Sequence, residues 1–180
     1  MSGTREEKHT MNPSLQRMAD GLRKAIQAER EGQHFYRMAA QITQDAQGRS
    51  VFQELAEDER IHEEFLRRHY DSVLKDGRLA SGEALVAPAA DRFAHPIFSA
   101  DLRKRAAGAH YEMTALSIGI QLEESAVRFY EGEAKACENP AAKEFYKTLV
   151  TWEQGHLSAL QRQADAMKEE YWGATGFAPF

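Results

Sequence analysis

Two short segments of the chain pair a glutamate with a histidine three residues later: Glu59 with His62, and Glu153 with His156. On a helix this spacing puts both side chains on one face, close enough to bind the same ion or neighbouring ions. A single pair of this kind arises by chance on many exposed helices, where glutamate is ordinarily solvated. Two copies at related positions favour a metal site over that simpler explanation.

The two pairs belong to an internal repeat whose equivalent residues lie 94 positions apart. The same offset relates Glu29 to Glu123, and each of these glutamates precedes a tyrosine, Tyr36 or Tyr130, by seven residues. The apolar residues around them repeat too, as the pairs Leu55 and Leu149, Leu66 and Leu160, and Phe52 and Tyr146. The repeat indicates two copies of one helical hairpin.

The repeated acidic residues lie in register with the apolar residues of their helices and should therefore face the core. An unpaired buried carboxylate costs on the order of several kcal/mol, so four together require positive partners, which two divalent cations would supply. One Glu from each of two helices and Glu-x-x-His from each of the other two is the ligand pattern of ferritin-like di-iron and di-manganese proteins. The candidate metal-ligating and catalytic residues are Glu29, Glu59, His62, Glu123, Glu153 and His156.

The donor types narrow the choice of metal. Mixed carboxylate and imidazole ligands favour Fe or Mn over metals that prefer thiolate, and over Mg or Ca, which rarely bind histidine. Zinc could occupy the site but has no redox chemistry. The single cysteine, Cys137, excludes a disulfide within the chain and a four-cysteine metal site.

Several residues near the motif have simpler interpretations. Tyr36 and Tyr130 are equally compatible with core packing and with hydrogen bonding to ligating carboxylates. In the acidic run around Glu59, Asp58 is expected on a solvated face, and Trp152 is expected to serve packing. Four histidines without a counterpart in the repeat are expected at the surface or as caps; they are His34, His69, His95 and His110.

Four long helices must position these residues. Apolar residues at steps of three and four predict a helix over residues 14–45, a second from a break at Gly48 to about residue 75, a third over 99–136 and a fourth from 140 to about 169. Gly77 should end the second helix, and Asn139 followed by proline should begin the fourth.

The long connection over residues 76–98 contains Gly77, Gly82, Pro88 and Pro96 and lacks sustained periodicity. Two helical hairpins joined by one such crossover make an all-α, ferritin-like four-helix bundle. We therefore expect one domain over residues 14–170, after a flexible N-terminus (1–13) and before a C-terminal tail (171–180).

Composition excludes some classes of partner. The formal net charge is −5, which provides no basic surface for nucleic acid or anionic lipid. No apolar run is long enough to span a membrane, and the first ten residues do not resemble a secretion signal. We expect a cytoplasmic protein that binds neither nucleic acid nor membranes.

With residues 29–36, 59–62, 123–130 and 153–156 considered together, the chain resembles the rubrerythrin and erythrin branch of the ferritin-like superfamily. The resemblance covers about residues 14–170. It implies that the six candidate residues bind two irons, with Glu59 and Glu153 as bridging ligands. It also implies a homodimer, sometimes with helices exchanged, and an external electron-donor protein.

Two departures from that family pattern bear on function. We expect no rubredoxin domain of the kind that true rubrerythrins carry, and Ala126 stands where they have an additional glutamate. We expect an oxidoreductase that oxidises Fe(II) with hydrogen peroxide or O2, acting as a peroxidase or ferroxidase. The alternatives are iron storage or delivery, hydroxylation of a small organic substrate, which would need an apolar pocket at the metals, and a non-catalytic metal-binding bundle.

Overall fold

The computed structural model describes residues 12–82, 95–104 and 109–175, and within these ranges the regular structure is entirely helical. This confirms the all-α class. The helices, in chain order, are α1 (Pro13–Ile42), α2 (Ala46–Asp76), α3 (Ala100–Lys104), α4 (His110–Ala136) and α5 (Pro140–Thr175).

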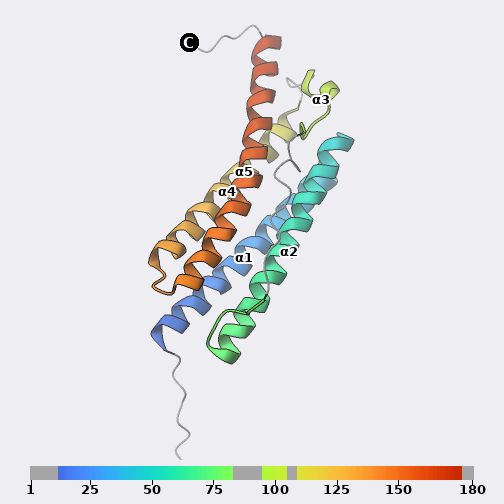
Figure 1. The fold of residues 1–180 in the computed structure, drawn as a ribbon. Coiled ribbons are helices and arrows are strands. Elements are labelled where there is room, and N and C mark those ends of the chain that lie inside the picture. Colours follow the sequence, from blue (N-terminus) through green and yellow to red (C-terminus); the bar gives the residue numbers. More distant parts are fainter. Residues whose placement is uncertain (1–11, 83–94, 105–108, 176–180) are drawn as a thin grey trace, which may run out of the picture.

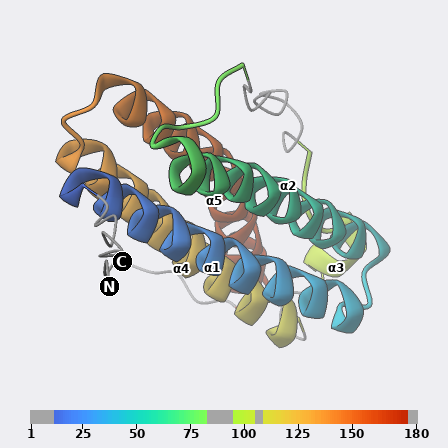
Figure 2. The same ribbon diagram turned by 90° about the horizontal axis from the view of Figure 1, so that it is seen from below.

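The four long helices form two hairpins, α1 with α2 and α4 with α5, which pack side by side as a ferritin-like bundle (Figures 1 and 2). The chain leaves α2 close to Leu15 at the start of α1 and returns at Pro96, whose carbonyl accepts a hydrogen bond from Gln47 at the start of α2. The connection thus travels the length of the bundle, as expected for a crossover. Part of it, residues 83–94, lies outside the described residues.

Side-chain caps explain most of the helix ends. Asn12 caps α1 and Asn139 caps α5. Each asparagine is followed directly by a proline, and its side-chain oxygen accepts hydrogen bonds from backbone N–H groups of the first turn. Gly77 ends α2 in the left-handed conformation, with φ 68°, which glycine adopts without a steric penalty. The predicted ends at Gly77 and Asn139 are confirmed.

The turn between α1 and α2 lies at residues 43–45, earlier than the predicted break at Gly48. Asp45 caps α2, and Gly48 lies inside the first turn of that helix. A Cβ at Gly48 would come within 2.3 Å of Phe98 Cε1, so the missing side chain makes room for that ring. The predicted break is wrong because Gly48 allows the Phe98 ring to pack closely against α2 and does not form the turn between the helices.

The predicted third helix over residues 99–136 is divided into α3 and α4. Ala109 precedes α4 with non-helical φ −91° and ψ 43°. The segment before α3 is held in place, since the Ile97 N–H donates to Gln163 Oε1 of α5 at 2.7 Å and the Ser99 N–H donates to Asp45 Oδ1 at 3.2 Å. Ala109 interrupts the predicted helix before α4, and residues 105–108, which fall within the prediction, lie outside the described residues.

The fourth predicted helix continues beyond residue 169 to the end of α5 at Thr175. Of the predicted termini, residues 1–11 and 176–180 lie outside the described residues. No helix in the described ranges is long and apolar enough to cross a membrane.

The apolar core has two parts, which flank a polar layer. We call them the Phe52 cluster, near the α1–α2 turn, and the Phe65 cluster, near the α4–α5 turn. Fully buried members of the Phe52 cluster include Phe52, Leu55, Phe98, Leu116 and Leu160; those of the Phe65 cluster include Leu22, Leu66, Tyr130 and Leu149. Along α2 and α5, the Glu-x-x-His pairs lie between a leucine of one cluster and a leucine of the other.

Candidate metal centre

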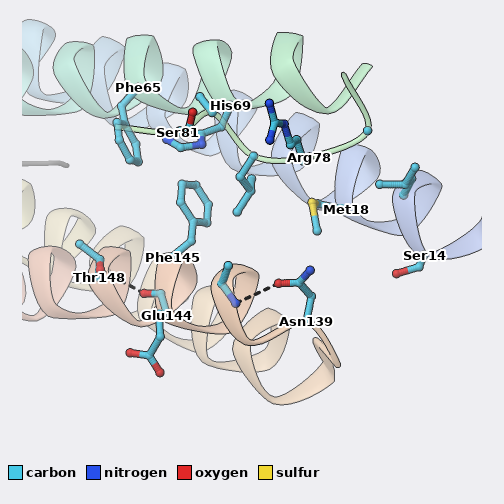
Figure 3. A pocket seen from close by; sticks show the side chains of 15 residues that line it. Ser14, Met18, Phe65, His69, Arg78, Ser81, Asn139, Glu144, Phe145 and Thr148 are labelled. Atoms are coloured by element: carbon cyan, nitrogen blue, oxygen red, sulfur yellow. Dashed lines mark hydrogen bonds between the residues drawn. The ribbon is translucent and has the colours of Figure 1, made fainter. Parts of the chain in front are cut away.

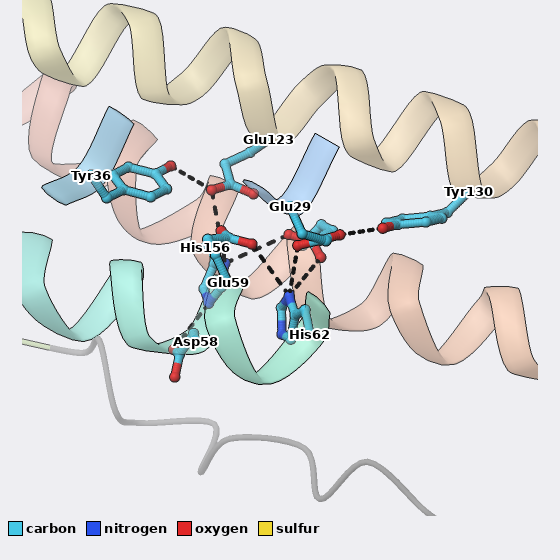
Figure 4. A network of polar contacts seen from close by, with 9 residues as sticks. Glu29, Tyr36, Asp58, Glu59, His62, Glu123, Tyr130 and His156 are labelled. Carbon is cyan, nitrogen blue, oxygen red and sulfur yellow. Dashed lines mark hydrogen bonds and ion pairs between the residues drawn. The ribbon is translucent and has the colours of Figure 1, made fainter. Parts of the chain in front are cut away.

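All six candidate ligands converge in the polar layer between the two apolar clusters (Figure 4). Each long helix contributes at least one of them, because the inward face of every helix passes through the same layer. Each of the six residues is buried, with at most 3% of its surface exposed. The contributions are Glu29 from α1, Glu59 and His62 from α2, Glu123 from α4, and Glu153 and His156 from α5.

The six residues form two overlapping groups, in each of which one donor atom per residue lies within 4.8 Å of the others. Both groups contain Glu59 and Glu153, so these two carboxylates lie between two adjacent metal-sized positions. The His62 group is Glu29, Glu59, His62 and Glu153; the His156 group is Glu59, Glu123, Glu153 and His156.

In the His62 group, the Nδ1 atom of the histidine faces the carboxylates. It lies 3.2 Å from Glu29 Oε2, 3.2 Å from Glu153 Oε1 and 3.4 Å from Glu59 Oε2. Convergence of three carboxylates on one ring nitrogen makes Nδ1 the nitrogen available for a metal.

The His156 group has the corresponding arrangement. The Nδ1 atom of His156 lies 3.5 Å from Glu59 Oε1, 3.6 Å from Glu153 Oε2 and 3.8 Å from Glu123 Oε1. The two imidazole rings are nearly parallel, at an interplanar angle of 17°, with centroids 5.6 Å apart. The internal repeat therefore appears in space as two similar half-sites.

The tyrosines link the two hairpins through the unshared glutamates. The hydroxyl of Tyr36 on α1 donates to Glu123 Oε1 on α4, and that of Tyr130 on α4 donates to Glu29 Oε1 on α1 (Figure 4). Both tyrosines are fully buried. Of the two interpretations that the sequence allowed, hydrogen bonding to the carboxylates is therefore the correct one, in addition to packing.

Without a metal, protons balance the charge of the buried carboxylates. Burial and the neighbouring charges of Glu153 and Glu59 raise the pKa of Glu29 well above its ordinary value. Burial, with the charge of Glu59, does the same for Glu123. The protonated form is therefore favoured at these two unshared glutamates.

The shared glutamates behave in the opposite way. Burial opposes ionisation of Glu153, but the charge of His62 and the hydrogen bonds with His156 and His62 together outweigh it and lower the pKa to about 2. Hydrogen bonds lower the pKa of Glu59 well below its ordinary value in spite of burial. Burial likewise disfavours charged histidines, yet the surrounding carboxylates raise the pKa of His62 and His156 well above the ordinary value.

Asp58 is a residue of this site that the sequence interpretation missed. It was expected on a solvated face, but it is 1% exposed and its Oδ2 lies 3.2 Å from Nε2 of His156 (Figure 4). The expectation is wrong because the inward face of α2 is wide enough to include it. Its spacing of three from Leu55 and four from His62 was the available signal.

His69 is a second correction: it was expected at the surface or as a cap, but it is 3% exposed. Its ring centroid lies 4.3 Å from that of Phe65 and 4.7 Å from that of Phe145. The three rings line a pocket of about 640 Å³ at the Phe65-cluster end of the bundle (Figure 3). The other three of these four histidines, His34, His95 and His110, are exposed, in agreement with the expectation of a surface position.

A smaller pocket, of about 290 Å³, opens directly over the polar layer between α1 and α4. Its wall includes the carboxylates of both groups and apolar side chains of Leu122 and Phe129. Gly32 and Ala126, which are equivalent in the repeat, also line it, and their small size leaves this side of the layer open. A small molecule could reach the carboxylates by this route.

Comparison with protein-family models matches residues 20–164 to the family described as rubrerythrin. The matched range includes all six candidate ligands, both tyrosines and Asp58. No curated protein and no solved structure matches the chain.

Proposed function

The chain belongs to the rubrerythrin family, and from this premise we propose that it is a di-iron oxidoreductase that oxidises Fe(II) with hydrogen peroxide or O2. The observation that supports the proposal best is the overlap of the two four-residue groups. Sharing of Glu59 and Glu153 would place two ions side by side, with one oxidant molecule able to reach both.

The donor set fits two ferrous ions. Four carboxylates balance the four positive charges of two divalent ions, and oxygen with imidazole nitrogen is a combination that suits iron and manganese. Each ion would have one unshared glutamate, one histidine and the two shared glutamates. Manganese is an alternative occupant, and zinc would fill the site without redox activity.

Bound iron would supply one electron per ion, and a pair would therefore deliver the two electrons that, together with two protons, reduce hydrogen peroxide to two waters. The chain's own residues would hold this pair. His62 and His156 fix one side of each position, while Glu59 and Glu153 span both. The hydrogen bonds from Tyr36 and Tyr130 keep the unshared glutamates oriented, as is common for carboxylates that bind metals.

The surrounding core would protect the reaction. The two apolar clusters flank the polar layer along the bundle, and among the described residues the pocket between α1 and α4 gives a route to it. Apolar surroundings of this kind limit side reactions of the oxidant with solvent. Electrons for renewed reduction of the metals would come from a separate donor protein.

The proposal is tested by loading the protein anaerobically with Fe(II) and mixing it rapidly with peroxide or with O2. We expect oxidation of both irons, followed by the absorption of the oxidised iron pair, with at least one of these oxidants. Glu59→Ala should abolish the reaction, whereas Glu57→Ala, an exposed glutamate on the same helix, should retain it. Failure of the loaded protein to react with either oxidant would contradict the proposal. Formation of a large shell with an iron core would favour storage instead.

A second candidate function, hydroxylation of a small organic substrate, is favoured by the 290 Å³ pocket. Its apolar side chains, including Ala28, Leu122 and Phe129, adjoin the carboxylates that would hold the metals. Ala126→Phe should fill this space. If the protein is a hydroxylase, small apolar ligands should perturb the spectrum of the di-iron form, and this substitution should remove the effect.

A further inference from the structure

The internal repeat provides a comparison of two metal positions within one molecule. Each position has one unshared glutamate that accepts a hydrogen bond from a tyrosine of the other hairpin, and each has one histidine with Nδ1 directed at the carboxylates. Because the remaining two carboxylates are shared, they contribute to both positions. The nearest ligands are thus closely matched, and any difference must come from the residues behind them.

The residue that precedes each shared glutamate differs between the two repeats. In the first repeat it is Asp58, and the equivalent residue of the second repeat is Trp152. Each reaches across to the histidine of the opposite hairpin: Asp58 Oδ2 lies 3.2 Å from His156 Nε2, and the Trp152 ring lies edge-on to His62 with centroids 4.4 Å apart. Both residues are buried.

This difference acts on the outer nitrogen of each histidine. A metal bound at Nδ1 leaves the ring proton on Nε2. At His156 that N–H can donate to the carboxylate of Asp58. At His62 the Nε2 atom is buried and, within the described part of the chain, has no hydrogen-bond partner.

A carboxylate behind a metal-binding histidine fixes the ring and makes its inner nitrogen a stronger donor. The negative charge of Asp58 also lies close to the His156 position, and its attraction for a cation acts in the same direction. Trp152 supplies packing but no charge. Both effects therefore strengthen the His156 position relative to the His62 position.

We propose that Asp58 is a positioning residue that makes the two metal positions unequal, so that the first divalent ion occupies the His156 group and the second occupies the His62 group. This inference rests on the proposed two-metal site. It adds an order of filling that neither the ligand set nor the family implies.

The proposal is tested with Zn(II) alone, which avoids oxidation. Isothermal titration calorimetry of the wild-type protein should show two binding steps whose dissociation constants differ by about tenfold or more. Asp58→Asn should weaken the tighter step by about 10–100-fold, the usual cost of removing a partner of a ligating histidine, and should bring the two steps together. Glu57→Gln, a change at the adjacent exposed acid, should leave both steps unchanged.

A second measurement uses the wild-type protein and does not depend on the folding of a variant. With ¹⁵N-labelled histidine, the Nδ1 resonance of His156 should shift with the first equivalent of Zn(II) and that of His62 with the second. Simultaneous shifts, or a first shift at His62, would overturn the order of filling. Binding of fewer than two ions would instead contradict the two-metal site itself, so the two failures are distinguishable.

Discussion

The polar layer and the apolar clusters on either side of it are built on the same four helices but are stabilised in different ways. In the Phe52 and Phe65 clusters, the helices bury leucine and aromatic side chains that need no further partner. In the layer between them, four carboxylates and two imidazoles are buried just as deeply. The clusters thus contribute favourable burial, whereas the polar layer is stable only if its charges are compensated.

The comparison shows how a helical bundle can accommodate a buried polar site whose formation is unfavourable in free energy. Removing polar side chains from water is unfavourable unless each finds a charged or hydrogen-bonding partner. In the metal-free protein, protons and the two tyrosine hydroxyls provide such partners, while the apolar clusters supply the stability of the fold. Metals should therefore change the polar layer strongly and the clusters little.

Metal removal should produce the largest effect. An ion present at 1,000 times its dissociation constant stabilises the folded state by about 4 kcal/mol, so two ions should raise the unfolding free energy well above that of the metal-free protein. Urea denaturation of EDTA-treated and Zn(II)-loaded protein measures this difference. In Glu59→Ala the gain should largely disappear. Equal unfolding midpoints for the loaded and the metal-free wild type would show that the layer needs no metal.

Metal uptake should also release protons and weaken steeply at low pH. The raised pKa values of Glu29, Glu123, His62 and His156 favour the protonated form of each group, and we expect each to carry a proton in the metal-free protein. Two ions should therefore displace about four protons, one from each of these groups. A pH-indicator dye in weakly buffered solution counts them during the titration. Uptake without proton release would mean that the buried charges are balanced in another way.

Leu66→Ala tests whether the stability of an apolar cluster can be changed without changing metal binding in the polar layer. Leu66 is fully buried in the Phe65 cluster, and its truncation should cost about 2–5 kcal/mol of unfolding free energy. Because Leu66 supplies no metal-binding atom, two ions per chain should still bind. Leu74→Ala, on the same helix but 49% exposed, is the matched control and should change stability little. Loss of metal binding in Leu66→Ala would show that the clusters and the layer are not separable.

Tyr36→Phe should have a smaller effect that is confined to the polar layer. It removes the hydroxyl that orients Glu123, and we expect a loss of about tenfold in metal affinity. Tyr146→Phe is a suitable control, because the Tyr146 hydroxyl is buried without a hydrogen-bond partner in the described part of the chain. Calorimetric titration of both variants gives the comparison. Equal affinities would leave Tyr36 with a packing role only.

Asp45→Asn should have the smallest effect on unfolding free energy and should leave metal binding in the polar layer unchanged. Burial raises the pKa of Asp45, but hydrogen bonds from Ser99 and the Gly48 N–H outweigh it and lower the pKa below the ordinary value. Its stabilising contribution is therefore present above the unfolded-state pKa and is lost as the pH falls through the folded-state pKa. We expect a cost of about 1 kcal/mol or less at neutral pH, and a weaker acid dependence of unfolding. An unchanged acid dependence would exclude this role of the cap.

Much of this architecture could be predicted from the sequence because the same helical hairpin pattern occurs twice in the chain. The repeat identified both hairpins and the residues that the structure brings together in the polar layer. The caps at Asn139 and Gly77 follow from local backbone requirements, which sequence expresses well. Contacts between the hairpins were harder to foresee, since nothing in the spacing of Tyr36 relates it to Glu123.

The errors share a physical cause, which is that a neighbour distant in sequence decided the local structure. Gly48 leaves room for Phe98 within the first turn of α2, and hydrogen bonds to Gln163 and Asp45 hold the segment that precedes α3. Asp58 was assigned to solvent because two of its neighbours are also acidic, yet His156 from the other hairpin is its partner. Helical periodicity identifies inward faces but does not reveal which partner each face will meet.

The most direct test of the central claim is a count of metal ions in a defined set of variants. Anaerobic protein should be saturated with Fe(II), freed of excess metal and analysed for iron per chain. We predict two ions per chain in the wild type and in Glu57→Ala, and fewer than one in Glu59→Ala and in Glu153→Ala, since these carboxylates contact both positions. One ion or none in the folded wild type, or two ions retained in Glu59→Ala, would contradict the two-metal site.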